Sequence, residues 1–253
     1  MLRAGCCEAT PQVVTSLSDC AINRSSIMHT DCKLGVVFLH HDITPVVQNN
    51  LASIRQCNPN AAIATISAGD PLPGGYTIRN TPEWQHRHAQ RPRKSADMLL
   101  CSWFHQRREK CDKWWIAEWD VYARQSVEAY YQPVWNYPFV ASDVALPYRR
   151  REWPWFRFAG WLPPAYRGFA LGAIPALWLL SEEALCATCN FLTRHPTLAG
   201  NGELRFGSAA NAAGFPPCGF SPPPHDRITW VEWKTIGPEK TIFHPVKHIP
   251  LEK

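Results

Sequence analysis

The sequence has no long uninterrupted apolar run, and its charge is not strongly of one sign. Its longest apolar stretch, Phe169 to Leu180, contains Gly172 and Pro175 and is too short to cross a bilayer. The formal net charge of +5 suits small anions or a membrane surface and does not by itself argue for nucleic acid. We therefore expect a soluble protein without a membrane span, with peripheral membrane association left open.

Two further features are missing near the start of the chain. The first thirty residues hold no apolar core of the kind that a signal peptide needs. No glycine-rich phosphate loop follows the first apolar strand, which disfavours a sugar-nucleotide pyrophosphorylase.

Cysteine, in contrast, is abundant, but the ten cysteines are irregularly spaced in a long chain. We interpret them as mostly free thiols in a reducing compartment, and so expect a cytoplasmic protein.

The most regular part of the sequence places an amphipathic helix between two apolar strands. Residues 34–39 form an apolar run that predicts a buried strand, and residues 62–67 form a second. Residues 45–54 carry apolar side chains at helical spacing, with Thr44 placed to cap the helix and Pro45 at its first position. A strand, a helix and a strand with short links predict a βαβ unit in a parallel sheet.

The same patterns predict the elements of the remaining chain. We expect helices over residues 95–110 and 181–193, a strand over 113–119, extended segments over 228–233 and 241–243, and loops over 71–94, 133–168 and 207–224. Residues 1–32 show no clear periodicity, and we interpret them as an N-terminal extension. Residues 33–253 are then expected to form a single domain.

Two carboxylates stand one residue apart where the strand at 113–119 ends. In a strand, residues i and i+2 point to the same face, so Glu118 and Asp120 are expected to project together. Two aligned carboxylates are costly to bury unless a cation lies between them. Acids that simply face water are the alternative. Because Asp42 and Asp70 also follow predicted strands, and ligands bind at the carboxyl ends of such strands, a divalent metal carrying phosphates is favoured.

Together these pieces resemble the GT-A-type glycosyltransferases, a family of single-domain nucleotide-sugar transferases, over about residues 34–248. Glu118-Trp119-Asp120 lies where the family carries its D-x-D metal motif, with glutamate in the first place. His244 and Lys247 resemble a C-terminal segment in which a histidine completes the metal shell and a lysine approaches phosphate. The resemblance therefore implies a metal held by Glu118, Asp120 and His244.

Other matches to the family concern the nucleotide and the acceptor. The strand at 34–39 matches the first nucleotide-binding strand, and Asp42 at its end is interpreted as a nucleotide contact. Asp97 stands where the family often keeps an acid near the nucleotide. The segment 168–173 resembles the glycine-containing stretch before the acceptor-side helix, and Glu203 falls where inverting members often place a catalytic carboxylate.

The resemblance implies an α/β fold with a Rossmann-type mixed, mostly parallel sheet flanked by helices. It also implies an inverting hexosyl- or N-acetylhexosaminyltransferase that uses Mn²⁺ or Mg²⁺. The donor would be a nucleotide-diphosphate sugar, and the acceptor a hydroxyl of a glycan or a lipid-linked sugar. Trp153, Trp155 and Trp161 are candidates to support the flat faces of sugars.

Three alternatives stay open at this stage. The basic and aromatic segment 148–158 could bind single-stranded nucleic acid, although the rest of the chain is not strongly basic. Cys186, Cys189, His195 and Cys218 could bind zinc, although one C-x-x-C pair is a weak signal. An inactive transferase-like protein that binds nucleotide or serves as a scaffold is the third.

Overall fold

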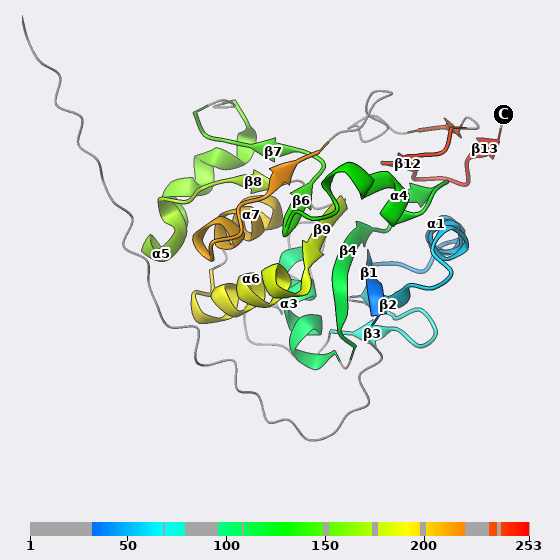
Figure 1. The fold of residues 1–253 in the computed structure, drawn as a ribbon, viewed down its shortest axis with the longest axis horizontal. Coiled ribbons are helices and arrows are strands. Elements are labelled where there is room, and N and C mark those ends of the chain that lie inside the picture. The colour runs from blue at the N-terminus through cyan, green and yellow to red at the C-terminus, as the bar shows by residue number, and fades with distance from the viewer. Residues whose placement is uncertain are drawn as a thin grey trace, which may run out of the picture.

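The computed structural model describes residues 32–67, 69–78, 96–107, 109–148, 152–173, 177–197, 201–220, 233–236 and 239–252. They form an α/β fold around a seven-stranded sheet, with strand order β10-β6-β9-β4-β1-β2-β3 (Figure 1). The strands are β1 (Cys32–His40), β2 (Ala62–Ser67), β3 (Tyr76–Thr77), β4 (Cys111–Glu118), β6 (Phe139–Ala141), β9 (Leu177–Ser181) and β10 (Cys218–Gly219). Only β9 runs against the other strands of this sheet. The predicted mixed, mostly parallel sheet is confirmed.

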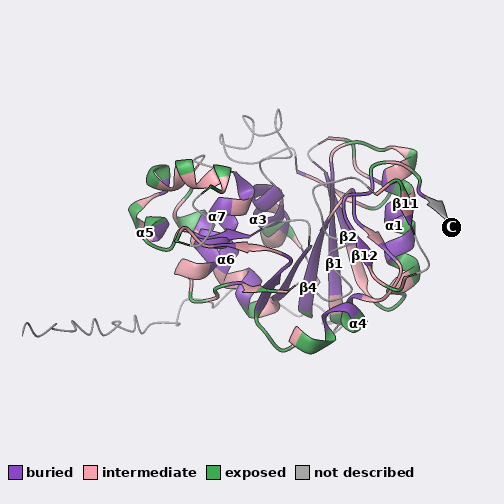
Figure 2. Ribbon diagram, turned by 90° about the horizontal axis from the view of Figure 1, so that it is seen from above, coloured by how far each residue is buried: buried purple, intermediate pink, exposed green. Residues whose placement is uncertain are grey.

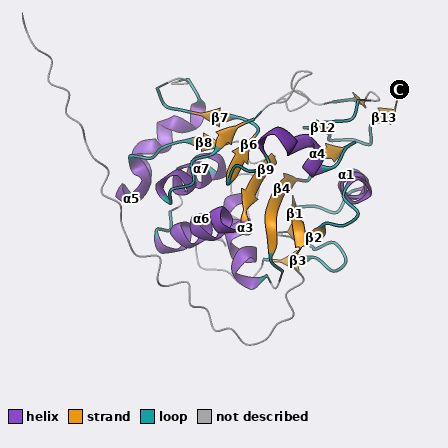
Figure 3. Cartoon of the chain, viewed as in Figure 1, coloured by secondary structure: helices purple, strands orange, loops and turns teal. Residues whose placement is uncertain are grey.

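Helices cover both faces of the sheet (Figure 3). The helices are α1 (Pro45–Cys57), α3 (Ala96–Gln106), α4 (Val127–Tyr131), α5 (Pro164–Arg167), α6 (Glu182–Arg194) and α7 (Gly202–Ala212), with 3₁₀ turns η2 (Gln132–Val134) and η3 (Pro154–Trp161). Three two-stranded pairs complete the fold: β5 (Tyr122–Ala123) with β12 (Ile242–Phe243), β7 (Val144–Ala145) with β8 (Gly172–Ala173), and β11 (Thr235–Ile236) with β13 (Leu251–Glu252).

The central strands are apolar on both faces, because alternate side chains enter two separate cores. From β4, Trp114 and Ile116 join the core beneath α3, α6 and α7, whereas Trp115 and Ala117 join the core beneath α1 and α4. These strands are buried along the middle of the molecule (Figure 2). This explains why the strands read as continuous apolar runs rather than as alternating ones.

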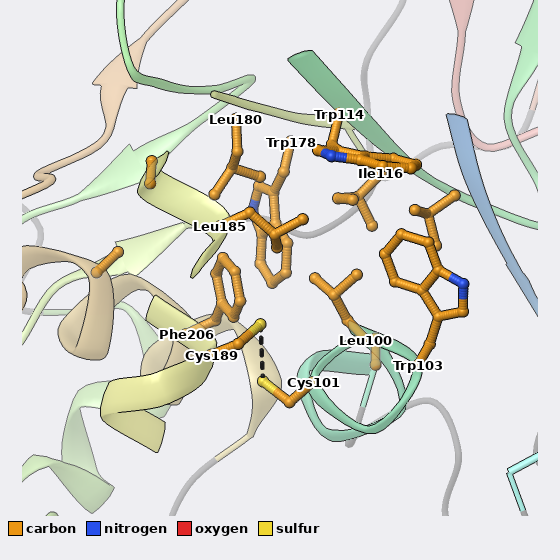
Figure 4. Close-up of a cluster of buried hydrophobic side chains, with 14 of the residues drawn as sticks. Leu100, Cys101, Trp103, Trp114, Ile116, Trp178, Leu180, Leu185, Cys189 and Phe206 are labelled. Carbon is orange, nitrogen blue, oxygen red and sulfur yellow. Dashed lines mark hydrogen bonds between the residues drawn. The ribbon is translucent and has the colours of Figure 1, made fainter. Parts of the chain in front are cut away.

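The core beneath α3, α6 and α7 is built from large rings and two thiols (Figure 4). Trp178 of β9 stacks on Phe206 of α7, with ring centroids 4.2 Å apart. Cys101 of α3 and Cys189 of α6 are both buried, and their sulfur atoms lie 3.3 Å apart. Burial raises the pKa of the Cys101 thiol well above its usual value, which keeps it protonated. These contacts fix the three helices against each other and against the sheet.

The βαβ unit at the start of the described chain is confirmed. α1 begins at Pro45, and the Thr44 hydroxyl accepts a hydrogen bond from the Val47 amide. β1 and β2 pair in parallel on either side of it. The helix predicted from residue 181 is also confirmed, since Ser181 caps α6 through the Ala184 amide.

The predicted loop over 207–224 is wrong over its first part, because α7 continues to Ala212. Gly207 does not end the helix. It is required for close packing, because a Cβ at this position would lie 2.5 Å from the Leu171 carbonyl oxygen. Residues 221–224 lie outside the described residues. The predicted loop over 133–168 contains η3 and α5 as well as β6 and β7.

Two of the described cysteines are not free thiols, while the expectation concerned most of the ten and not all of them. Cys32 and Cys111 stand opposite each other at the beginnings of β1 and β4, and they form a disulfide with a Cα–Cα distance of 4.5 Å. The other five described cysteines form no disulfide. Most of residues 1–32, the expected N-terminal extension, lies outside the described residues, and Cys32 already belongs to β1. Among the described helices, none combines the length and the apolar character needed to cross a membrane.

Candidate active site

Glu118, Asp120 and His244 lie together at the carboxyl end of β4. Each offers one ligand atom, and these atoms are all within 4.8 Å of one another. Nε2 of His244 is 3.3 Å from Oδ1 of Asp120. Asp120 and His244 are buried and Glu118 is half-buried. The three residues that the family resemblance grouped from distant parts of the sequence are therefore neighbours in the fold.

The polar atoms of this group fit a divalent cation. Oδ1 of Asp120 and Nδ1 of His244 are buried and have no hydrogen-bond partner among the described residues. A buried carboxylate oxygen that accepts no hydrogen bond is costly, and a bound cation would remove that cost. Two carboxylates and one imidazole suit a first-row dication such as Mn²⁺, which accepts both oxygen and nitrogen ligands.

The predicted reason for the closeness of Glu118 and Asp120 is wrong. β4 ends at Glu118, and residues 119–120 form a turn closed by a hydrogen bond from the Val121 amide to the Glu118 carbonyl, 3.1 Å long. The two carboxylates therefore approach each other around a turn and do not share one face of a strand. The short spacing still brings them together, since a tight turn returns the chain on itself within a few residues.

A buried network brings His244 to this turn. β12 pairs antiparallel with β5, directly after the turn, and the Val246 amide donates to the Asp120 carbonyl at 2.7 Å. The side-chain amide of Asn50, on α1, donates to the carbonyls of Trp119 and Val246, at 3.1 and 3.0 Å. Asn50 thus holds the turn and the C-terminal segment in one place.

Sequence reasoning missed Asn50, although a signal was present. The buried face of α1 carries Val47, Leu51 and Ile54, and Asn50 lies on that same face. A fully buried asparagine among apolar residues needs hydrogen-bond partners. Such a residue indicates a long-range polar contact, but the pattern does not say with which segment.

Glu203 lies in the first turn of α7, where Asn201 caps the helix through the Leu204 amide at 3.1 Å. Burial is the main cause that raises the pKa of Glu203 from its ordinary value of 4.5 to about 7. Hydrogen bonds from the side chains of Asn201 and Trp155 act in the opposite direction, and the nearby charge of Asp143 adds to the rise. Oε2 of Glu203 is buried and has no hydrogen-bond partner within the described part of the chain.

Glu203 and the three candidate metal ligands lie at the same edge of the sheet. Asp143 lies just after the carboxyl end of β6, and Glu118 lies at the carboxyl end of β4. These two strands run in the same direction, with β9 between them, so both acids lie at the same edge. Two strand spacings amount to about 10 Å. The charge of Asp143 adds to the raised pKa of Glu203, so Glu203 lies near Asp143 at this edge.

The other predicted nucleotide contacts have different environments. Asp97 is fully buried, and both of its oxygens accept hydrogen bonds of 2.9 Å from the guanidinium of Arg205. The carboxylate thus has a structural partner, which joins α3 to α7. Asp42 and Lys247 are exposed; Asp42 follows β1 and Lys247 follows Val246. Sequence patterns did not identify Arg205 as the partner of Asp97, because the two residues are 108 positions apart.

The four residues of the alternative zinc site do not form a metal-binding group in the described part of the chain. Cys189 faces Cys101, and the His195 ring packs on Phe191 with centroids 4.7 Å apart. Within the described residues, the group that could hold a metal is Glu118, Asp120 and His244.

The chain is distantly similar to solved glycosyltransferase structures. The galactosyltransferase LgtC, in complex with donor and acceptor sugar analogues, shares 14% identity over 81% of this chain and 76% of its own, with a TM-score of 0.41. Mouse xyloside xylosyltransferase 1, in its apo form, shares 10% identity over 76% of this chain and 85% of its own, also with a TM-score of 0.41. No protein-family model matches the chain, and no curated protein matches it significantly.

Proposed function

We propose that the chain is a metal-assisted glycosyltransferase that moves a hexosyl or N-acetylhexosaminyl group from a nucleotide-diphosphate donor to a hydroxyl acceptor. The observation that carries this proposal is the convergence of Glu118, Asp120 and His244. A turn after β4 and a segment far along the chain bring together three side chains of types that bind metals, at the carboxyl edge of a mostly parallel sheet, and this supports the proposal. Ligands of open α/β sheets bind at that edge.

Glu118, Asp120 and His244 would hold the metal, for which Mn²⁺ is the best match and Mg²⁺ the alternative. When bound, it supplies positive charge beside the diphosphate that leaves. Lys247 lies exposed, three residues after His244, and can reach toward the same phosphates. Asp42 is proposed as a contact to the rest of the nucleotide, since it follows β1 at this edge.

Glu203 is proposed as the general base. It takes the proton of the acceptor hydroxyl as that oxygen bonds to the anomeric carbon, while the bond from this carbon to the diphosphate breaks and its electrons leave with the phosphate. A pKa of about 7 suits a base that works near neutral pH. Because Glu203 belongs to α7 and the metal ligands to the turn after β4 and the C-terminal segment, base and leaving group can lie on opposite sides of the sugar. That arrangement inverts the anomeric configuration.

A thermal-shift panel of nucleotide diphosphates and nucleotide sugars, with and without Mn²⁺, tests the proposal. A ligand that binds only the native state raises the melting temperature by mass action. We expect a Mn²⁺-dependent rise that Asp120→Asn removes. Asp112→Asn is the matched control, since Asp112 is an exposed acid at the other end of β4 and should keep the rise.

Two outcomes would contradict the proposal. If no nucleotide stabilises the protein, there is no donor site. If a nucleotide stabilises it equally without metal and in Asp120→Asn, the acids after β4 do not act through a cation, and a nucleotide-binding protein without transferase activity becomes the better description.

A further inference from the structure

Three aromatic side chains form a row along η3. A 3₁₀ helix has about three residues per turn, so residues spaced by three lie on one line. The rings of Trp155 and Phe158 are nearly parallel, with centroids 6.2 Å apart and planes at 21°. The rings of Phe158 and Trp161 follow at 5.4 Å and 61°. We refer to Trp155, Phe158 and Trp161 as the aromatic row.

The aromatic row runs from the candidate general base to solvent. At its inner end, Trp155 packs against the buried cluster that includes Leu204, the residue after Glu203, and its side chain is near enough to lower the pKa of the Glu203 carboxyl. At its outer end, Trp161 is 69% exposed, the largest exposed fraction among the large apolar side chains of the described residues. η3 and α5 form the outlying end of the molecule, where many residues are exposed (Figure 2).

The row is supported from beneath and is not a loose surface loop. Leu162, Tyr166 and Leu204 form a small buried core under η3, and Leu204 belongs to the same turn of α7 as Glu203. Trp153 packs so closely on β8 that a Cβ on Gly172 would lie 2.2 Å from its ring. The position of the row relative to Glu203 is therefore set by packing.

We propose that the aromatic row binds an acceptor made of several linked sugar rings, whose reacting end lies at Glu203. This inference rests on the proposed function and specifies its acceptor as an extended oligosaccharide rather than a single small hydroxyl compound. Sugar rings present apolar C–H faces that pack on aromatic faces and edges, while their hydroxyls stay hydrogen-bonded. The exposed Arg157 guanidinium lies 4.7 Å from the centroid of Phe158 and offers donors to those hydroxyls.

The charges at the inner end decide between a saccharide and other partners of aromatic surfaces. Glu203 and Asp143 lie there, so the phosphates of a nucleic acid would meet carboxylates instead of cations. Acyl chains of a membrane would meet an ionisable carboxylate whose Oε2 already lacks a partner. A sugar hydroxyl, in contrast, satisfies that oxygen by donating a hydrogen bond to it.

Direct binding of linear oligosaccharides, without donor or metal, tests the inference. Titration calorimetry with cello-, malto-, chito- and galacturonate oligomers of two to five rings covers neutral, acetamido and acidic sugars. We expect at least one series to bind more tightly with length. Trp161→Ala should weaken the longest member about tenfold, the equivalent of about 1.4 kcal/mol, and leave the shortest member unchanged. Tyr137→Ala, an exposed aromatic outside the row, is the control and should bind as the wild type does.

Three results would overturn the inference. They are a wild-type protein that binds none of the four series, binding that does not depend on length, and equal losses in Trp161→Ala and Tyr137→Ala. Vesicles of anionic lipid and a single-stranded oligonucleotide are tested in parallel. If Trp161→Ala loses binding only to the vesicles, or only to the oligonucleotide, the aromatic row binds that partner instead of an oligosaccharide. Because no nucleotide is present, oligosaccharide binding can succeed where the nucleotide panel fails, and the reverse, so the two proposals fail separately.

Discussion

Replacing Glu203 by glutamine should stabilise the protein above neutral pH and abolish its transfer activity. The pKa of Glu203 is raised in the folded state, mainly by burial, so the folded protein binds this proton more tightly than the unfolded chain does. The stabilisation from the protonated carboxyl is fully present below the unfolded pKa of 4.5, and it is lost as the pH rises through the folded pKa of about 7. Glutamine keeps the shape and has no proton to lose.

The size of the effect follows from the pKa. A rise from 4.5 to about 7 corresponds to about 3 kcal/mol, because one pKa unit is worth about 1.4 kcal/mol. The wild-type free energy of unfolding should therefore fall by about 1.4 kcal/mol per pH unit between these values, relative to Glu203→Gln, and the difference should level off above pH 8 or so. At the lowest pH of this window the two proteins should differ only by the substitution itself.

Urea denaturation of both proteins at closely spaced pH values from acid to mildly alkaline measures this difference. Glu183→Gln is the matched control, since Glu183 is an exposed glutamate in the first turn of α6. It removes an exposed glutamate instead of a buried one, and so gives the baseline against which the pH dependence of Glu203→Gln is compared. A difference for Glu203→Gln that is flat with pH would refute the reasoning, because Glu203 would then have the same pKa in the folded and unfolded states. The activity of the wild type should rise as the pH passes about 7, where the base loses its proton.

Three further predictions concern the framework of the site. Asp97→Ala should lower the free energy of unfolding by about 3–5 kcal/mol in urea denaturation, because it leaves the buried guanidinium of Arg205 without its partner; a loss below 1 kcal/mol or so would contradict this. Reducing the bond between Cys32 and Cys111, which are 79 residues apart, should cost about 4 kcal/mol by loop entropy, and mass spectrometry of unreduced peptides should first detect the linked pair. Asn50→Leu should weaken Mn²⁺ binding about 10- to 100-fold in calorimetry, whereas unchanged affinity would show that Asn50 does not position the ligands.

The elements that the sequence predicted correctly are those in which local pattern and tertiary packing agree. The strand at 34–39 and the helix after Thr44 are examples, because an apolar run must be buried and a capped amphipathic segment must cover it. α7 is the opposite case. Gly207 and the prolines after it indicate a loop, but Gly207 is required by the close approach of Leu171, and the following prolines lie beyond the end of the helix at Ala212.

The site was predicted in part for the same reason. Glu118 and Asp120 are near each other in sequence, so either a strand or a turn would bring their side chains together. Their closeness was therefore predicted correctly, although the strand assumed for residues 119–120 is a turn. His244 could be added only through the family resemblance, since its approach depends on Asn50 and on the pairing of β12 with β5. Asp97 pairs with Arg205, and Cys32 with Cys111, over long distances in the sequence. The residues around each of them do not indicate which partner it has.

α7 carries two charged residues, Glu203 and Arg205, which differ in how completely their side chains are hydrogen-bonded. This difference is relevant to function. Arg205 is fully buried with both hydrogen bonds to Asp97 made, so it fixes the helix against α3. Glu203, two residues earlier, is largely buried with Oε2 unpaired, which destabilises the fold above neutral pH. A chain that can pair one charge so completely within one helix turn could accommodate a glutamine at the other without loss of packing. A largely buried carboxyl group with one oxygen unpaired, two residues from a well-paired guanidinium, is therefore better explained by a ligand that arrives from outside, and a donating hydroxyl of the acceptor fits both its charge and its pKa.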